Sequence, residues 1–451
     1  MNRLVVAILF IFGIKCNIGG DTLSLFFSLS GLNTYTGLSA ASVNRLENHI
    51  RELLKKYESE FQPMLEELSN NNELIGGADE TFFERFMILI FMDLPSGFLF
   101  LEKSSKDRKF ETWNSETSGF IAQFKKFTCL VSDRAKAILK LAKHHGLEGT
   151  ADLFHFLMKP VGLFKFAFSE KLKTLAKEKK QLTVELKDII NEADIRVHNE
   201  QLTVIENKTL VIQQGQSHYR QELQMISTTV HPFDLHLKQQ TSEKISNKLN
   251  SSVQSFRKIL ANCGIDDKKN ALDKMEKQID SIAPISDLWW QWVNVDVTLL
   301  GTRLELQDAI RELLLPFVYF KMQQKKSKSK KSLREIYQRV CETAEELVMS
   351  HSLVSELTSD SWMKWAKAMC RKFQRTTSAI EGRNGLLAGF NLCTRGMTEL
   401  QLQSQKILHN FWIKREDGTT AVERCFGIKP EIDLFEFVLK NMKELPLPRS
   451  S

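Results

Sequence analysis

Hydrophobic residues recur at helical spacing in the first part of the chain. The apolar run 4–14 predicts a buried helix, and a second helix follows through residues 23–32. Ser39 is a candidate N-cap for a third helix, whose apolar positions begin at Val43. Residues 1–66 are therefore predicted to form an N-terminal helical segment. Its pattern fits a truncated helix-turn-helix DNA-binding segment, although any short three-helix unit would give the same pattern.

The spacing of hydrophobic residues changes after residue 66, where short apolar stretches are separated by turn residues. Three of these stretches in succession predict a strand meander rather than a helix. Helical and strand-like stretches then alternate, which gives the order strand, strand, strand, helix, strand, helix, strand. The predicted strands cover residues 73–83, 86–97, 98–104, 127–133 and 151–156, and the two helices cover 112–127 and 134–146.

Helical patterning dominates the rest of the chain. It includes a long charged stretch from Lys171 to Met225 with partial heptad character, and a lysine-rich run at 325–331. We divide the chain into four predicted parts. These are the N-terminal segment 1–66, a first core part 67–160, an all-helical insertion 161–350, and a second core part 351–451.

Composition narrows the class of protein. With 42% hydrophobic and 26% charged residues the chain is globular, and with only 21 Gly and 9 Pro it favours long helices over tight turns. The formal net charge of +7 suits a polyanionic partner. The seven cysteines are dispersed, which favours reduced thiols in a cytosol-like compartment. The N-terminal apolar run is too short to span a bilayer, and Lys15 precedes Cys16 where a lipoprotein site would need a small residue.

Three acidic residues stand at positions that suit metal-dependent chemistry. Asp79 ends the first apolar stretch, Asp133 ends the fourth, and Glu381 lies in TSAIEGRNGLL, where Thr and Ser precede a helical pattern. Carboxylates at the ends of neighbouring strands, joined by one from a helix, can hold hard divalent cations. Taken singly, each of these acids is equally typical of a strand end or a helix cap.

Six strings occur in an order that resembles DDE transposases of bacterial insertion sequences. They are GGADETFF, LPSGFLFLEK with DRKFETW, VSDRAKAILKLA, ADLFH, RTTSAIEGRNG and HNFWIKREDGTTAVERCFG. The resemblance implies an α/β RNase H-like catalytic core interrupted by a large all-α insertion, in a protein that is mostly helical overall. Cys425 departs from the aromatic residue expected in the last string, and the N-terminus is shorter than a complete DNA-binding region.

The resemblance also implies roles for individual residues. Asp79, Asp133 and Glu381 would be the catalytic, metal-binding triad, with Mg2+ as the cofactor and Mn2+ as its substitute. Asp152 and His155 match a D-x-x-H string and would form a structural pair near the site.

Basic residues near these strings are candidate contacts to DNA phosphates. Arg134 follows Asp133, Arg383 follows Glu381, and the others precede Glu381 or belong to the lysine run. Solvated surface charge is the alternative for each of them. The candidates are Arg134, Arg371, Lys372, Arg375, Arg383, Lys325 and Lys326.

Together these features predict a transposase that cleaves DNA strands and transfers them during transposition of an insertion sequence. Its expected partners are double-stranded DNA at the transposon ends and at the target, with a homo-oligomer forming on DNA and no membrane contact. The expected location is the cytoplasm, at the nucleoid. Two alternatives stay open: an inactive DNA-binding remnant of such an element, and a helical scaffold that binds protein partners through the charged stretch 171–225.

Overall fold

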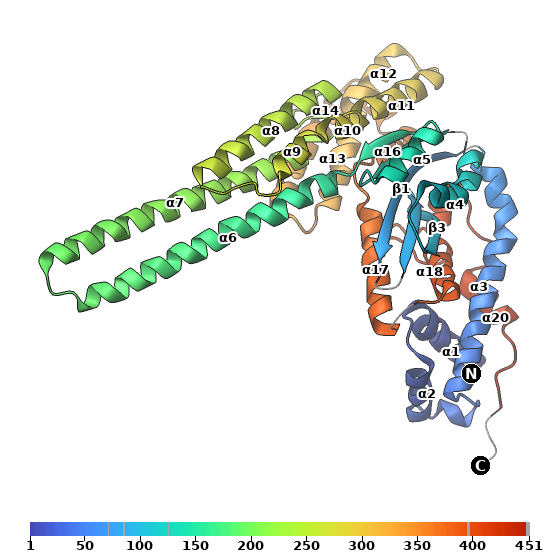
Figure 1. The fold of residues 1–451 in the computed structure, drawn as a ribbon. Coiled ribbons are helices and arrows are strands. Elements are labelled where there is room, and N and C mark those ends of the chain that lie inside the picture. Colours follow the sequence, from blue (N-terminus) through green and yellow to red (C-terminus); the bar gives the residue numbers. More distant parts are fainter. Residues whose placement is uncertain (71, 84–85, 125, 395–396, 448–451) are drawn as a thin grey trace. The chain divides into compact units, whose positions relative to one another are not determined.

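The computed structural model describes residues 1–70, 72–83, 86–124, 126–394 and 397–447 (Figure 1). The chain divides into two compact units. The first combines Met1–Gly149 with Thr376–Ser451, and the second is Thr150–Arg375. The second unit therefore begins earlier and ends later than the predicted insertion 161–350. The N-terminal helices belong to the first unit and do not form a unit of their own.

A mixed five-stranded sheet forms the centre of the first unit, within a chain that is otherwise mostly helical. The strand order is β3-β2-β1-β4-β5. β1 pairs with β2 and β2 with β3 in antiparallel fashion, whereas β1 and β4 run parallel. The strands are β1 (Glu73–Phe82), β2 (Met87–Asp93), β3 (Phe98–Ser105), β4 (Lys126–Ser132) and β5 (Glu148–Ala151).

The predicted order of strands and helices in this region is confirmed. α4 (Phe110–Gln123) lies between β3 and β4, and α5 (Lys136–His144) lies between β4 and β5. The predicted position of the fifth strand, 151–156, is wrong. The strand ends at Ala151, because Asp152 accepts a hydrogen bond from the backbone N–H of Phe154 and so caps the helix that follows.

The N-terminal helices share one hydrophobic core with the sheet and the C-terminal helices. They are α1 (Asn2–Ile8), a π-helix (Leu9–Lys15), α2 (Gly20–Leu29) and α3 (Ala40–Ser69). The predicted cap is confirmed, since the Ser39 side chain accepts a hydrogen bond from the Ser42 backbone. Residues 30–39 join α2 to α3, whereas a helix-turn-helix uses a turn of three or four residues. The predicted helix-turn-helix geometry is therefore not found here.

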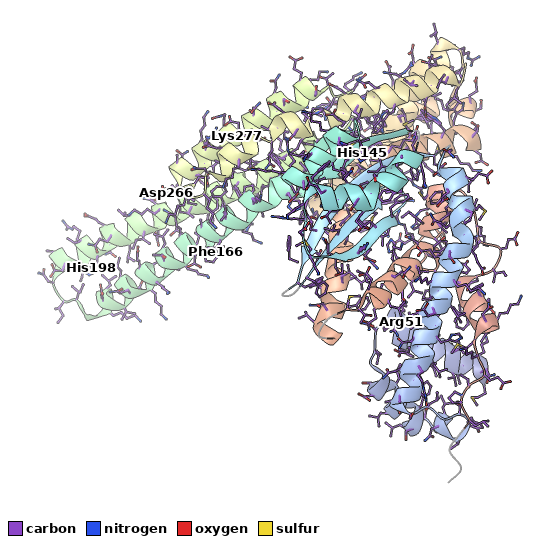
Figure 2. All side chains as sticks on the ribbon, turned by 45° about the vertical axis from the view of Figure 1, so that its right-hand side comes forward. Arg51, His145, Phe166, His198, Asp266 and Lys277 are labelled. Atoms are coloured by element: carbon purple, nitrogen blue, oxygen red, sulfur yellow. The ribbon has the colours of Figure 1, made fainter. Side chains whose placement is uncertain are left out.

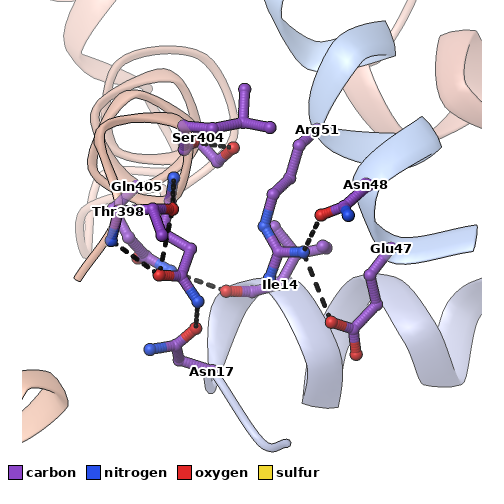
Figure 3. A network of polar contacts seen from close by, with 10 residues as sticks. Ile14, Asn17, Glu47, Asn48, Arg51, Thr398, Ser404 and Gln405 are labelled. Carbon is purple, nitrogen blue, oxygen red and sulfur yellow. Dashed lines mark hydrogen bonds and ion pairs between the residues drawn. The ribbon is translucent and has the colours of Figure 1, made fainter. Parts of the chain in front are cut away.

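Polar contacts also tie the N-terminal helices to the C-terminal part of the chain. The Gln405 amide donates a hydrogen bond to the Ile14 carbonyl at 2.6 Å (Figure 3). Within α3 itself, the Arg51 guanidinium pairs with Glu47 at 3.3 Å. Burial raises the pKa of Glu47 and lowers that of Arg51. The C-terminal helices of this unit are α17 (Ser378–Thr394), α18 (Glu399–Phe411), α19 (Ala421–Phe426) and α20 (Leu434–Asn441).

The second unit is helical apart from its first residues. Its long helices are α6 (Leu153–Glu185), α7 (Glu192–Thr229), α8 (Ser242–Asn262), α11 (Ile285–Leu299), α13 (Leu315–Lys326), α14 (Lys331–Ser350) and α16 (Asp360–Lys372). Shorter elements are the 3-10 turn Leu186–Asp188, α9 (Ala271–Glu276), α10 (Ile279–Ile282), α12 (Leu304–Ala309), the π-helix Ile310–Leu314 and α15 (Val354–Leu357).

Buried aromatic residues form the core of this unit where α7 ends. Trp289 and Trp290 are buried, and their indole N–H groups donate to the carbonyls of Met369 and Pro232. His231 is fully buried between the hydroxyls of Tyr319 and Tyr337. The tryptophan cluster is thus part of the core. Within the described part of the chain, no helix is long and apolar enough to cross a membrane.

Candidate active site

The parallel pairing of β1 and β4 brings two of the predicted acidic residues to the same edge of the sheet. Gly77 on β1 is in register with Val131 on β4. Asp79 lies two residues further along β1, and Asp133 lies two residues after Val131, directly after β4 ends at Ser132. The two acidic residues therefore belong to neighbouring parallel strands, Asp79 within β1 and Asp133 in the turn that follows β4.

Helix α17 supplies the third acidic residue. Its first turn contains Glu381, whose backbone N–H bonds to the Thr377 carbonyl at 3.0 Å. The helix can approach β1 closely because Gly77 has no side chain. A Cβ atom at Gly77 would lie 2.9 Å from the Ile380 side chain and 2.6 Å from that of Leu94. Gly77 and Ile380 thus set the distance between Glu381 and the strand that carries Asp79.

Two side chains of α17 fix this helix on one face of the sheet. Asp79, Ile90 and Glu102 are register partners across β1, β2 and β3, so they share a face. The Asn384 amide donates to the Asp79 carboxylate at 2.9 Å. The Arg383 guanidinium makes two bonds of 2.7 Å to Glu102, and both side chains are buried. The first turns of α17 are therefore anchored on β1 and on β3.

The carboxylates of Asp79, Asp133 and Glu381 interact electrostatically. The pKa of Asp79 is raised to about 7, mainly by burial and also by the negative charges of Glu381, Asp133 and Glu80, against a lowering hydrogen bond from the Glu80 backbone. Asp79 is 7% exposed, whereas Asp133 is exposed and accepts a hydrogen bond from the Ala135 backbone. Crowded negative charge of this kind is relieved by a proton or by a cation.

The oxygen atoms at this site suit a hard divalent cation. The Asn384 amide N–H bonds to Asp79, and its amide oxygen is buried and has no hydrogen-bond partner among the described residues. Carboxylate and amide oxygens are the ligands that Mg2+ takes in proteins. Within the described ranges, no three His, Cys, Asp or Glu side chains lie close enough together to hold a metal ion as they stand.

The other acidic candidates have structural roles. Asp93 ends β2, is 3% exposed, and accepts hydrogen bonds from the backbones of Ile75 and Ser96 and from the Ser96 hydroxyl. Asp152 caps α6. Asp152 and His155 both belong to the second unit, unlike the three acidic residues.

The predicted DNA contacts separate into internal and exposed residues. Arg383 forms an ion pair with Glu102. Arg375 donates hydrogen bonds to the carbonyls of Ser227 and Val230 at 2.9 and 2.6 Å. We therefore withdraw these two residues as phosphate contacts, because their guanidinium groups hold the protein interior together. Lys372 lies 3.7 Å from the carboxylate of Asp296.

The remaining basic candidates stay predictions. Arg371, Lys325 and Lys326 are exposed, and the lysine run joins α13 to α14. Arg134 is half-buried, in the left-handed backbone conformation (φ 67°), and its backbone N–H bonds to the Ser132 hydroxyl. The turn after β4 therefore places Arg134 directly beside Asp133 in the chain.

Sequence reasoning did not single out Asn384. It lies three residues after Glu381 on the same helix, and this spacing puts both side chains on one face. That spacing is the signal from which a second polar residue at the site could have been found. The Arg383–Glu102 pair had no such signal, because its partners are far apart in the sequence.

The C-terminal part of the chain matches a described protein family. Residues 310–451 match the family described as a family of unknown function (DUF6399). The match includes α17 with Glu381 and Asn384. No curated protein matches the sequence.

Proposed function

We propose that this chain is a DDE-type transposase with an RNase H-like catalytic core, acting on double-stranded DNA. The observation that carries the proposal is the placement of Asp79 in β1 and of Asp133 directly after the neighbouring parallel strand β4, with the charge of Glu381 acting on Asp79. The strand order 3-2-1-4-5, with its first three strands antiparallel and the fourth parallel to the first, also supports it. The proposed location is the nucleoid.

The residues at the site would act by binding and positioning. Asp79, Asp133 and Glu381 would hold Mg2+, and when bound the cation would activate the attacking oxygen and stabilise the leaving oxygen. Asn384 orients the Asp79 carboxylate through its amide N–H. In the proposed reaction water attacks the phosphodiester at the element's end and breaks its bond to the 3' oxygen, which leaves as a 3' hydroxyl. This hydroxyl then attacks a phosphodiester of the target DNA and displaces the 3' oxygen of the target strand.

The first test replaces one carboxylate. Asp133→Asn keeps the size of the side chain and removes its charge, so folding and DNA binding should persist while Mg2+-dependent nicking of a DNA substrate is lost. The control is Asp360→Asn, because Asp360 is exposed in the first turn of α16. Asp93→Asn would not serve, because Asp93 is a buried turn residue. Full nicking by the Asp133 variant would remove this residue from the site.

A second variant tests the positioning role of Asn384. Asn384→Ala removes the hydrogen bond to Asp79, so nicking should fall by roughly 10- to 100-fold and more Mg2+ should be needed for half-maximal rate. Leu386→Ala, at an exposed position of the same helix, is the matched control. A fall in rate with an unchanged Mg2+ dependence would point to a purely structural effect.

A further inference from the structure

The first turns of α6 and the segment around α9 enclose a cavity in the second unit. α9 packs against α6, and the cavity between them has a volume of about 530 Å³. This volume lies within the range of roughly 300–1,000 Å³ that is typical of small-molecule sites. The described lining residues all lie between His155 and Gln278, so the cavity belongs to the second unit alone.

The cavity has an apolar wall. Phe156 and Leu163 come from α6, and Ala271 and Met275 come from α9. Phe156 and Met275 are 2% and 3% exposed, so both are held in place by the core around them. An aromatic ring and a thioether together offer a polarizable surface for a planar, largely apolar group.

Gly162 leaves this space open. It lies inside α6 and lines the cavity, and a Cβ atom there would meet no atom within 4 Å. Glycine is unfavourable inside a helix compared with alanine or leucine. Close packing within the protein does not require glycine at this position, whereas a larger side chain would extend into the cavity.

Three lysines give the cavity a positive charge. Lys159, Lys269 and Lys274 line it, and no acidic residue is among its described lining residues. None of the three lysines forms an ion pair with a described residue, and the Lys274 ammonium donates to the Lys269 carbonyl at 2.9 Å. The charge of the cavity is therefore available to an anion from solution.

The acidic residues of the same segment are engaged elsewhere. Asp266 and Lys277 bracket this segment in Figure 2. The Asp267 carboxylate accepts hydrogen bonds from two backbone N–H groups at the start of α9, both at 2.8 Å. Asp273 and Glu276 both pair with Arg257 of α8, at 2.6 and 2.8 Å. These carboxylates therefore do not neutralise the three lysines.

A polar group in the wall narrows the class of ligand. Gln278 is half-buried, and its side-chain amide has no hydrogen-bond partner among the described residues. An amide offers both a donor and an acceptor, as the edge of a nucleobase does, whereas an acyl chain would bury it unpaired. Three ammonium groups match the several charges of a phosphate chain better than a single carboxylate.

We propose that this cavity binds a free nucleoside triphosphate. Its base would lie on Phe156 and Met275 with its edge toward Gln278, and its phosphates would lie at Lys159, Lys269 and Lys274. The proposal concerns binding and includes no hydrolysis. It goes beyond the proposed strand-transfer chemistry and does not depend on it.

Calorimetric titration of the full chain with ATP in the presence of EDTA tests the proposal. The chelator removes divalent cations that could bridge ATP to the acidic residues of the first unit. The wild type should bind one ATP with a dissociation constant of about 0.1 mM or tighter. Gly162→Leu should weaken binding at least about 10-fold, because the leucine side chain fills the cavity while it favours the helix. Thermal unfolding of the variant reports whether it is folded.

A second variant tests the charge of the cavity. Lys159→Gln with Lys269→Gln should weaken ATP binding by roughly 10- to 100-fold, since two phosphate contacts are lost. Lys277→Gln is the matched control, because Lys277 is exposed in the same segment and is not among the lining residues. Its ATP binding should equal that of the wild type.

Three results would overturn the proposal. The first is a wild type that does not bind ATP, even if it binds a DNA strand at the same residues. The second is ATP binding that neither Gly162→Leu nor the double lysine variant weakens. The third is sodium triphosphate binding as tightly as ATP, because the lysines would then attract charge alone and the base would not be recognised.

Discussion

Two buried titratable groups of the first unit respond to their surroundings in opposite ways. Asp79 has a pKa of about 7 because burial and neighbouring carboxylates disfavour its charged form. His409 has a pKa of about 4, since burial and the charge of Arg383 disfavour its protonated form. Its Nε2–H donates to the Gly97 carbonyl at 2.8 Å, so this histidine is a packed helix residue.

The low pKa of His409 predicts a loss of stability in acid. In the unfolded chain His409 is protonated below its ordinary pKa of 6.5, whereas in the folded chain it is protonated only below about pH 4. The free energy of unfolding should therefore fall by about 3 kcal/mol from this group between pH 6.5 and 4. Urea unfolding of the wild type and of His409→Gln across that range measures the difference. Equal slopes for both proteins would contradict the assignment.

At the scale of elements, the close contact between α17 and β1 depends on Gly77. Gly77→Ala places a Cβ within 3 Å of both Leu94 and Ile380. The variant should lose roughly 1–3 kcal/mol of unfolding free energy, because the helix must move away from the strand. Urea unfolding measures the loss, and nicking activity should fall with it, since the same contact positions Glu381.

Gly389→Ala is the control for this prediction. Gly389 lies in the same helix and a Cβ there meets no atom within 4 Å. Alanine favours helix over glycine, so this variant should be more stable by up to about 1 kcal/mol. If both substitutions changed stability alike, close packing at Gly77 would not be the cause.

Strand and helix order was predictable because it depends on local pattern, and the three-strand meander before Ser105 illustrates this. The fifth strand was misplaced because Glu148–Ala151 is too short for an alternating pattern, while the apolar run after it is a capped helix. Asn384 and the Arg383–Glu102 pair were missed for a different reason. Their partners come from β1 and β3, and only the folded sheet brings these strands to α17.

At the scale of the whole molecule, the net charge of +7 predicts salt-sensitive binding to DNA. Lys325 and Lys326 are exposed, so replacing both with Gln should lower the slope of log affinity against log salt by about 2 if both contact phosphates. A fluorescence titration with a DNA duplex at several salt concentrations measures the slope. Lys277→Gln, at another exposed lysine, is the control. Equal slopes for the wild type and the double variant would show that Lys325 and Lys326 do not contact DNA phosphates.

The first unit is made of two separate stretches of chain, and this has a consequence for the order of events during synthesis. The strands that carry Asp79 and Asp133 leave the ribosome well before α17, because all of the second unit is translated between them. Until α17 and α18 are synthesised, part of the apolar surface of the sheet stays uncovered. During this part of synthesis the nascent chain is therefore prone to aggregation, and it contains Asp79 and Asp133 but not yet Glu381. A truncated chain that ends between residues 150 and 375 would keep this uncovered apolar surface and would lack Glu381.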